Sequence, residues 1–224
     1  PVFVEPDEYF NIDANKIEQA ITDKTKAIMV THLYGQASEM TRIVNIATKH
    51  HLQVIEDCAQ SHGACFAGKM TGTFGISGCF SFYPTKNLGA FGDAGAVVTD
   101  DETFAEKLRM MRNYGSKIKY YNEIAGINSR LDEMQAALLR VKLSHLQALN
   151  DERKMLAQRY NEGIKNPIVW LPKVREDAES IYHQYVVKCM SRDFLQESLE
   201  QSGIQTQIHY PIPPHLAQCY HFLG

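Results

Sequence analysis

The segment that decides the fold is residues 54–95, which read VIEDCAQSHGACFAGKMTGTFGISGCFSFYPTKNLGAFGDAG. It opens with a short apolar strand candidate that ends at Asp57, and it is crowded with glycine. Such density indicates tight turns or backbone that approaches a ligand closely, because glycine elsewhere costs conformational entropy. We therefore expect both structural turns and a ligand-binding backbone here. The glycines are residues 63, 68, 72, 75, 78, 89, 92 and 95.

Short apolar runs alternate with amphipathic segments on both sides of this stretch. Residues 27–32 and 54–56 have the composition of buried strands, and residues 41–50 between them have helical periodicity. Residues 78–82 and 94–99 are rich in small, aromatic and β-branched side chains, which favours two further strands. The pattern predicts an α/β sheet whose parallel strands are joined by right-handed crossovers.

The second half of the chain is more helical. We expect a helix at 102–113 capped by Asp100 or Asp101, and a long helix that follows Ser129 and ends near residue 160. A strand, a helix and a strand then follow, at residues 185–189, 193–201 and 205–210. This pattern predicts a large domain over residues 1–150 and part of a smaller α/β domain over residues 151–224.

Composition narrows the function classes. The 224 residues carry a formal net charge of −3 with no block of like charges, which argues against nucleic acid or anionic membrane as partners. The apolar runs are too short to span a membrane and no signal peptide opens the chain, so we expect a cytoplasmic protein. The five cysteines form no Cys-x-x-Cys pair, which favours free thiols and no metal site.

The ends of the chain suggest a piece of a longer protein. The sequence begins at Pro1 rather than at a methionine, and it stops just after the apolar cluster at residues 216–222. We therefore expect the whole protein to extend beyond these residues.

Two side chains of the glycine-rich segment are candidates for chemistry. Asp57 follows a strand that we expect to be parallel, and the carboxyl ends of such strands face the crevice where open α/β sheets bind ligands. Lys86 lies in a loop between two strand candidates, flanked by Pro84 and Gly89. Taken alone, Asp57 could equally cap a helix or form a salt bridge, and Lys86 could be a solvated surface lysine.

Taken together, the motifs resemble those of the DegT/DnrJ/EryC1/StrS sugar aminotransferases. The family hallmark is EDxAQ, then a glycine-rich segment, then a serine-phenylalanine pair shortly before the cofactor lysine. This sequence has these parts, and the likeness continues upstream and downstream. The matching segments are Glu56-Asp57-Cys58-Ala59-Gln60, Ser81-Phe82, Lys86, His32-Leu33-Tyr34-Gly35 and Gly126-Ile127-Asn128-Ser129-Arg130.

The resemblance implies a fold and a cofactor. The fold would be the large-domain sheet of a fold type I aminotransferase dependent on pyridoxal 5'-phosphate, incomplete here, with the start of a smaller α/β C-terminal domain. Lys86 would carry the cofactor as a Schiff base and, once released, act as the base that moves a proton. Asp57 would lie against the pyridine nitrogen and keep it protonated.

The resemblance also assigns further cofactor contacts. Ala59 would pack beneath the ring, and Gln60 would hydrogen-bond the ring hydroxyl. Ser81 would bind the phosphate, and Asn128 would reach the phosphate from the other subunit of a homodimer. One active site would therefore need two chains.

Four other residues match family positions near the cofactor or the sugar nucleotide, and each has a structural alternative. His62 and Tyr83 could be packing residues. His209 and Tyr210 precede Pro211 in a proline-rich turn, which could be a simple connection between strand and helix.

The segment after the lysine predicts a substrate. Residues 87–90 and 92–95 read NLGA and GDAG, which resembles the subgroup that aminates a 3-keto sugar nucleotide. We expect glutamate as the amino-acid donor and a dTDP-linked 3-keto-6-deoxyhexose as the acceptor in deoxysugar biosynthesis.

Two other readings stay open. One is a dehydratase of the same family, although such enzymes carry histidine in place of the lysine. The other is a non-catalytic or regulatory member that binds the cofactor. Complete members also carry a preceding segment that grips the phosphate, so residues 1–224 alone should bind the cofactor weakly.

Overall fold

The computed structural model describes residues 1–223 and divides the chain into two compact units. The large unit comprises residues 1–165 and 172–186. The small unit comprises residues 166–171 and the chain from residue 187 onward. No helix within residues 1–223 combines the length and the apolar character that crossing a membrane requires.

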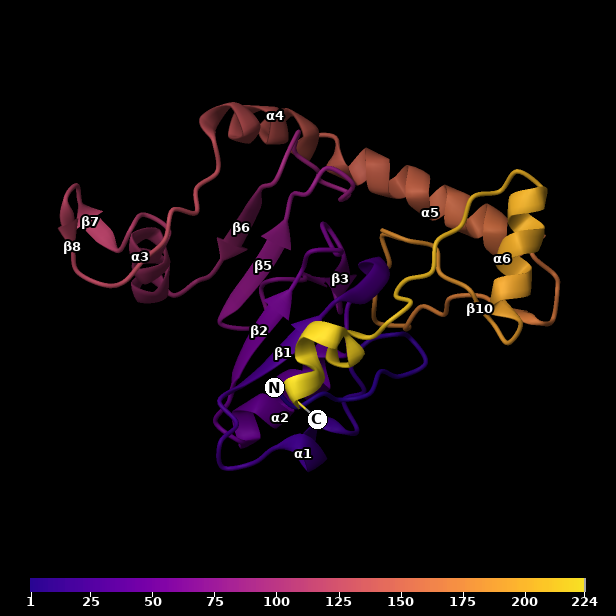
Figure 1. The fold of residues 1–224 in the computed structure, drawn as a ribbon, viewed down its shortest axis with the longest axis horizontal. Coiled ribbons are helices and arrows are strands. Elements are labelled where there is room, and N and C mark those ends of the chain that lie inside the picture. Colours follow the sequence, from indigo (N-terminus) through magenta and orange to yellow (C-terminus); the bar gives the residue numbers. More distant parts are fainter. Residues whose placement is uncertain (224) are drawn as a thin grey trace. The chain divides into compact units, whose positions relative to one another are not determined.

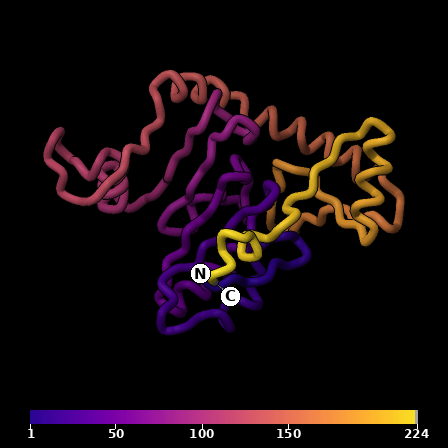
Figure 2. The backbone as a smooth tube through the Cα atoms, viewed as in Figure 1, coloured from indigo at the N-terminus to yellow at the C-terminus, as the bar shows by residue number. Residues whose placement is uncertain are grey.

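A four-stranded sheet forms the centre of the large unit (Figures 1 and 2). Its strands lie in the order β1-β2-β5-β6. The first three run parallel, which confirms the predicted α/β sheet, whereas β6 runs antiparallel to β5. The connection between β5 and β6 contains no crossover helix, and a loop of that kind permits antiparallel pairing. The strands are β1 (Ala27–Thr31), β2 (Gln53–Asp57), β5 (Ser77–Ser81) and β6 (Gly95–Val98).

One face of this sheet is buried against α2 (Met40–Lys49). Because side chains alternate along a strand, Ile28, Val30 and Val54 point to the same face, and all are at most 6% exposed. The helix begins at Glu39, whose carboxylate accepts a hydrogen bond from the Arg42 amide. Its apolar side chains pack on those strands and contribute about 1.5–3 kcal/mol for each large residue buried.

The opposite face of the sheet is only partly covered. Met29 on β1 is 66% exposed and Val97 on β6 is 47% exposed. Asp57 shares this face, because it pairs through Cys79 with Val97 in the register of the sheet. The two faces therefore differ in burial across the same strands.

Short elements complete the first part of the large unit. The helix α1 (Ile17–Ala20) precedes β1, and a 3-10 turn, η1 (Leu33–Gly35), follows it. The connection between β2 and β5 folds into a small hairpin, β3 (Cys65–Phe66) and β4 (Lys69–Met70).

The helical half of the large unit follows β6. The helix α3 (Glu102–Met111) begins at Asp101, as predicted, and that carboxylate accepts from the Phe104 amide at 2.9 Å. A second hairpin then forms, β7 (Ser116–Ile118) and β8 (Tyr121–Asn122).

The single long helix predicted after Ser129 is wrong in detail, since the structure has two. They are α4 (Glu133–Leu143) and α5 (Leu146–Gly163). The break falls at Ser144, whose hydroxyl bonds back to the Val141 carbonyl at 2.7 Å, a local bond that competes with helix continuation.

The small unit contains α6 (Arg192–Gln201) and an antiparallel pair, β9 (Val169–Trp170) and β10 (Lys188–Cys189). Two 3-10 turns, η2 (Pro214–Leu216) and η3 (Gln218–Leu223), lie near its end. The strand predicted at residues 185–189 forms only at 188–189, and the one at 205–210 does not form. Residues 205–210 form no ladder or bridge with another described segment, and an extended segment without a pairing partner is not a strand.

Candidate active site

Asp57 is the last residue of β2 and points to the partly covered face of the sheet. Its Oδ1 accepts a hydrogen bond from the Ala59 amide at 3.0 Å, which fixes the turn that follows the strand. The Cys58 amide donates to the Cys79 carbonyl at 2.8 Å and holds this turn to β5. The Asp57 carboxylate is half-buried, and its Oδ2 makes no hydrogen bond with another residue that the structure describes.

Ser81 and Lys86 reach the same edge from the neighbouring strand. Ser81 ends β5, which is parallel to β2, so both carboxyl ends lie together. The Lys86 amide donates to the Tyr83 carbonyl at 2.9 Å and forms a tight turn. Partial burial lowers the pKa of the Lys86 ammonium, and the nearby Asp57 carboxylate opposes that fall in pKa. The two residues that the sequence singled out therefore lie on the same side of the sheet edge, close enough for the charge of Asp57 to act on Lys86.

Gln60 and Ala59 occupy the turn after β2. The Gln60 side-chain oxygen accepts from the Tyr34 amide at 2.6 Å, and the residue is 7% exposed. Its Nε2 group makes no hydrogen bond to another described residue, so it can donate to an oxygen of a ligand. Ala59 is half-buried beside Asp57.

His62 is placed in the interior, and Tyr83 at the surface. The His62 ring lies 5.4 Å from the Phe80 ring and 5.8 Å from the Phe82 ring, between centroids. Burial lowers the pKa of His62 to about 4, so the ring is neutral near pH 7. It lies near the Ser81 backbone, but neither ring nitrogen meets hydrogen-bond geometry with a described residue. Tyr83 is 50% exposed, and contact of either residue with a ligand stays a prediction.

The other predicted residues lie outside this group. Asn128 is exposed between β8 and α4, where its Oδ1 accepts from the Arg130 Nε at 3.0 Å. His209 and Tyr210 belong to the small unit, with ring centroids 4.2 Å apart. Their predicted roles toward the phosphate and the substrate stay predictions.

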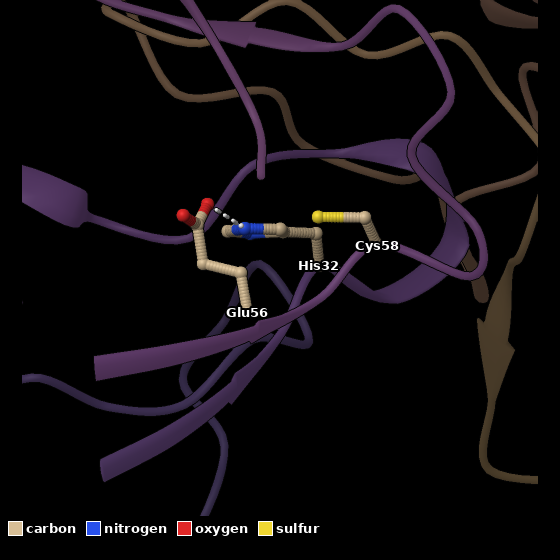
Figure 3. Close-up of side chains that lie close together, drawn as sticks. All are labelled: His32, Glu56 and Cys58. Atoms are coloured by element: carbon tan, nitrogen blue, oxygen red, sulfur yellow. Dashed lines mark hydrogen bonds and ion pairs between the residues drawn. The ribbon is translucent and has the colours of Figure 1, made fainter. Parts of the chain in front are cut away.

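A buried polar cluster that the sequence did not reveal lies on the other face of β2 (Figure 3). The His32 Nε2 is 3.0 Å from the Glu56 Oε2, and both side chains are fully buried. The Ser38 amide donates to the His32 Nδ1 at 3.1 Å, so Nδ1 is the acceptor and Nε2 carries the proton. A glutamate inside the apolar strand of residues 54–57 was the one signal that could have indicated such a site.

Glu56 is the centre of this cluster. Its carboxylate accepts the amides of Gly72 at 2.7 Å, Phe74 at 2.7 Å and Gly75 at 2.9 Å in addition to His32. Burial by itself would raise the pKa of Glu56, but the hydrogen bonds from His32, Gly72 and Gly75 outweigh it and lower that pKa. Glu56 therefore stays ionised and ties β2 to the segment that leads into β5.

The cluster does not fit a metal ion, although ligand atoms of His32, Glu56 and Cys58 lie within 4.8 Å of one another. Both His32 nitrogens and both Glu56 oxygens are already engaged in hydrogen bonds. Burial, and secondarily Glu56, raises the pKa of the Cys58 thiol to about 12, so it is not the thiolate that metals require. The cluster therefore stabilises the fold, because its hydrogen bonds join β2 to the segment that precedes β5.

Comparison with known proteins found a family and relatives that match nearly the whole of this chain. A model of the DegT/DnrJ/EryC1/StrS aminotransferase family matches residues 1–223. A dTDP-3-amino-3,6-dideoxy-alpha-D-galactopyranose transaminase of Aneurinibacillus thermoaerophilus is 53% identical, over 98% of this chain and 61% of its own. A pleiotropic regulatory protein of Geobacillus stearothermophilus is 46% identical, over 100% of this chain and 61% of its own.

A solved structure has the same fold. The crystal structure of S. venezuelae DesV in complex with a ketimine intermediate has a TM-score of 0.95 and 47% identity, over 98% of this chain and 60% of that one. The chain thus spans about 60% of the length of the relatives that it matches. The α/β sheet and the motif residues at its carboxyl edge agree with the family match over these residues. The chain belongs to the DegT/DnrJ/EryC1/StrS aminotransferase family, because a model of that family matches residues 1–223.

Proposed function

We propose that the whole protein is a pyridoxal-phosphate-dependent aminotransferase that acts on a keto sugar nucleotide. The amino group of an amino acid, glutamate in our proposal, moves to the keto carbon of the sugar, and the donor leaves as a keto acid. The observation that carries this proposal is the arrangement of Asp57 and Ser81 at the ends of two neighbouring parallel strands, with Lys86 in the loop that directly follows Ser81. The names of the transaminase relatives support the class of substrate.

The residues at this edge fit the cofactor. Lys86 offers the amine that would bind it, Asp57 the carboxylate for the ring nitrogen, and Ser81 a hydroxyl for the phosphate. Gln60 presents its free Nε2 donor, which suits the ring hydroxyl. Bound pyridoxal phosphate supplies the electron sink that makes transfer of an amino group possible.

The chain's own residues then divide the work. A lowered pKa increases the fraction of Lys86 that is a neutral amine, the form that attacks a carbonyl and accepts a proton. Asp57 holds a proton on the ring nitrogen by its negative charge, and the Ala59 amide keeps the carboxylate oriented. Partial burial of Lys86 keeps some water away from this proton transfer.

We further propose a homodimer in which Asn128 of each chain reaches the phosphate bound by the other. Asn128 is exposed. The helix α4 that follows it exposes apolar side chains that water does not favour, and such patches mark protein interfaces. They are Met134 at 80% exposure, Leu138 at 42% and Val141 at 63%.

Residues 1–224 alone should bind the cofactor weakly in this account. The sheet face that carries Asp57 leaves Met29 and Val97 exposed, although parallel sheets are normally covered on both faces. Dialysis of residues 1–224 against pyridoxal phosphate, followed by measurement of bound cofactor, tests this. Tight stoichiometric binding would contradict it.

A regulatory function is the second candidate, because one relative is named a pleiotropic regulatory protein. Lys86 and the lowering of its pKa favour catalysis over binding alone. The dehydratase reading is disfavoured, because Lys86 stands where such enzymes carry histidine.

A substrate panel tests the proposed function. The whole protein is mixed with pyridoxal phosphate, glutamate and keto sugar nucleotides that differ in nucleotide and in the position of the keto group. We expect turnover of a dTDP-3-keto-6-deoxyhexose, loss of turnover in Lys86→Ala, and normal turnover in Lys107→Ala, an exposed lysine on α3. Turnover of 4-keto sugars alone would contradict the substrate, and cofactor binding without any turnover would favour regulation.

A further inference from the structure

A buried chain of hydrogen bonds runs beside Lys86 and joins four distant parts of the large unit. Asn150 on α5 donates its Nδ2 to the His62 carbonyl at 2.9 Å. The Asn87 Nδ2 donates to the Asn150 Oδ1 at 2.8 Å. The Asn87 Oδ1 lies 2.9 Å from the His183 Nδ1. Asn87 and Asn150 are 7% and 1% exposed, so water cannot replace these bonds.

The donor and the acceptor of each bond in this chain of hydrogen bonds follow from the His62 carbonyl at one end. The His62 carbonyl can only accept, so the amide nitrogen of Asn150 must face it. The Asn150 oxygen then faces Asn87, which must donate with its own nitrogen. The Asn87 oxygen is left as an acceptor, so the His183 Nδ1 carries a proton and donates. Each side chain thus has one arrangement.

The cost of burying Asn150 shows that this chain is not incidental packing. Asparagine is a poor helix former, and a buried amide is unfavourable unless it is hydrogen-bonded. Gly63 makes the approach possible, because a Cβ there would lie 3.0 Å from the Asn150 Nδ2. The helix α5 therefore places the Asn150 side-chain amide at one of its few buried positions. There the amide oxygen accepts a hydrogen bond from Asn87, in the loop that carries Lys86.

The position of Asn87 connects the chain to the chemistry. Asn87 directly follows Lys86, at the tip of the loop between β5 and β6. The base of this loop is closed by the Phe82 amide, which donates to the Ala94 carbonyl at 2.8 Å, and within it the Ala90 amide donates to the Phe82 carbonyl at 2.7 Å. At the tip, side-chain bonds from Asn87 anchor the backbone on the side of α5. That anchor limits how far the Lys86 backbone can move relative to Asp57.

We infer that Asn87 and Asn150 are positioning residues for the amine of Lys86. This inference rests on the proposed function. The pair fixes the turn that carries Lys86, so that its amine meets the cofactor and returns to the same place for proton transfer. Without the pair the amine of Lys86 samples positions away from the reacting atoms, and misplacement of about 1 Å can cost about 100-fold in rate.

The test uses the whole protein with pyridoxal phosphate and compares Asn150→Ala, Asn87→Ala and the double variant. Borohydride reduction and peptide mass measurement give the fraction of Lys86 that carries cofactor. Steady-state kinetics give kcat and KM for glutamate. Asn161→Ala is the matched control, since Asn161 is an exposed asparagine on the same helix, where it accepts from the Tyr185 hydroxyl at 2.6 Å.

Each single variant should lower kcat by about 10–100-fold with KM for glutamate unchanged. The double variant should be no slower than the slower single variant, because both act through one chain of bonds. If Asn150→Ala does not fold, Asn87→Ala carries the test alone, because it leaves the bond from Asn150 to the His62 carbonyl in place; its kcat should fall by the same about 10–100-fold.

Two results would overturn the inference. Unchanged kcat per cofactor-loaded Lys86 in well-folded single variants would show that the pair does not position the amine, while leaving the proposed function intact. An unmodified protein that never carries cofactor at Lys86 would remove the proposed function, and the inference with it.

Discussion

Glu56 and Asp57 are consecutive residues of β2 that face opposite sides of one sheet, and their surroundings differ sharply. Glu56 is fully buried and accepts four hydrogen bonds, three of them from backbone amides. Asp57 is half-buried and accepts one, from Ala59. Glu56, which stabilises the fold, has both carboxylate oxygens engaged in hydrogen bonds within the protein. Asp57, which we propose for chemistry, has an oxygen that can still accept a hydrogen bond from a ligand.

This difference extends beyond the two carboxylates. On the Glu56 side, His32 uses both of its nitrogens and Cys58 is held as a thiol. On the Asp57 side, Gln60 keeps an unused donor and Lys86 has a lowered pKa. Because polar groups of the second set are not engaged within the part of the fold that the structure describes and Lys86 has a perturbed pKa, the second set is the one expected to bind a ligand.

The largest effect should come from Asp57→Asn in the whole protein. The amide still accepts from Ala59, so the fold persists, but it has no charge to keep the ring nitrogen protonated. We expect aminotransferase activity to fall by about 10²–10⁴-fold, the range for a lost proton-transfer group, with the thermal midpoint unchanged. Activity close to that of the unmodified protein would place the functional carboxylate elsewhere.

Glu56→Ala should produce the opposite pattern. It leaves the Nε2–H of the neutral His32 and three backbone amides buried without an acceptor, and each buried donor left unsatisfied typically costs about 1–3 kcal/mol. Urea denaturation measures this loss of unfolding free energy. Glu106→Ala, which removes an exposed pair with Lys117, is the control and should cost less than about 1 kcal/mol. Equal costs for the two variants would remove the distinction between the faces.

The pH dependence of stability should report His62. Burial lowers its pKa from 6.5 to about 4 in the folded chain. Between these two pH values the unfolded chain therefore binds a proton at His62 and the folded chain does not. Stability is therefore unaffected above pH 6.5 and falls as the pH drops toward 4, by on the order of 2 kcal/mol at pH 5. Chemical denaturation between pH 5 and pH 7.5 measures it. His62→Phe should lose this part of the dependence, and an identical profile would show that His62 is not the cause.

The smallest effect comes from a surface position that belongs to neither face. Asp101→Ala removes the cap of α3, where the carboxylate accepts from the Phe104 amide, and should cost about 1 kcal/mol. Activity should stay unchanged. A loss of activity without a loss of stability would mean that α3 takes part in the site.

The sequence predicted the parts that depend on local pattern. The strands at β1, β2, β5 and β6 follow from apolar runs, and the Asp101 cap follows from a carboxylate before a helix. Asp57 could be singled out because a strand end is recognisable from its own residues.

The parts that depend on distant pairing could not be predicted. His32 and Glu56 are 24 positions apart, and Asn87 and Asn150 are 63 apart, so only the folded topology brings them together. The break between α4 and α5 was missed because the apolar periodicity continues across it, and only a local bond of the Ser144 hydroxyl accompanies it. The strand at residues 205–210 was predicted from local pattern, yet no other described segment pairs with it.

We propose Lys86 as the amine that binds pyridoxal phosphate beside Asp57. The direct measurement is borohydride reduction of the whole protein with pyridoxal phosphate, followed by mass mapping of its peptides. We predict one modified lysine, Lys86, and reduced labelling in Asp57→Asn. Labelling of another lysine, or no labelling under conditions where the protein is folded, would contradict the claim.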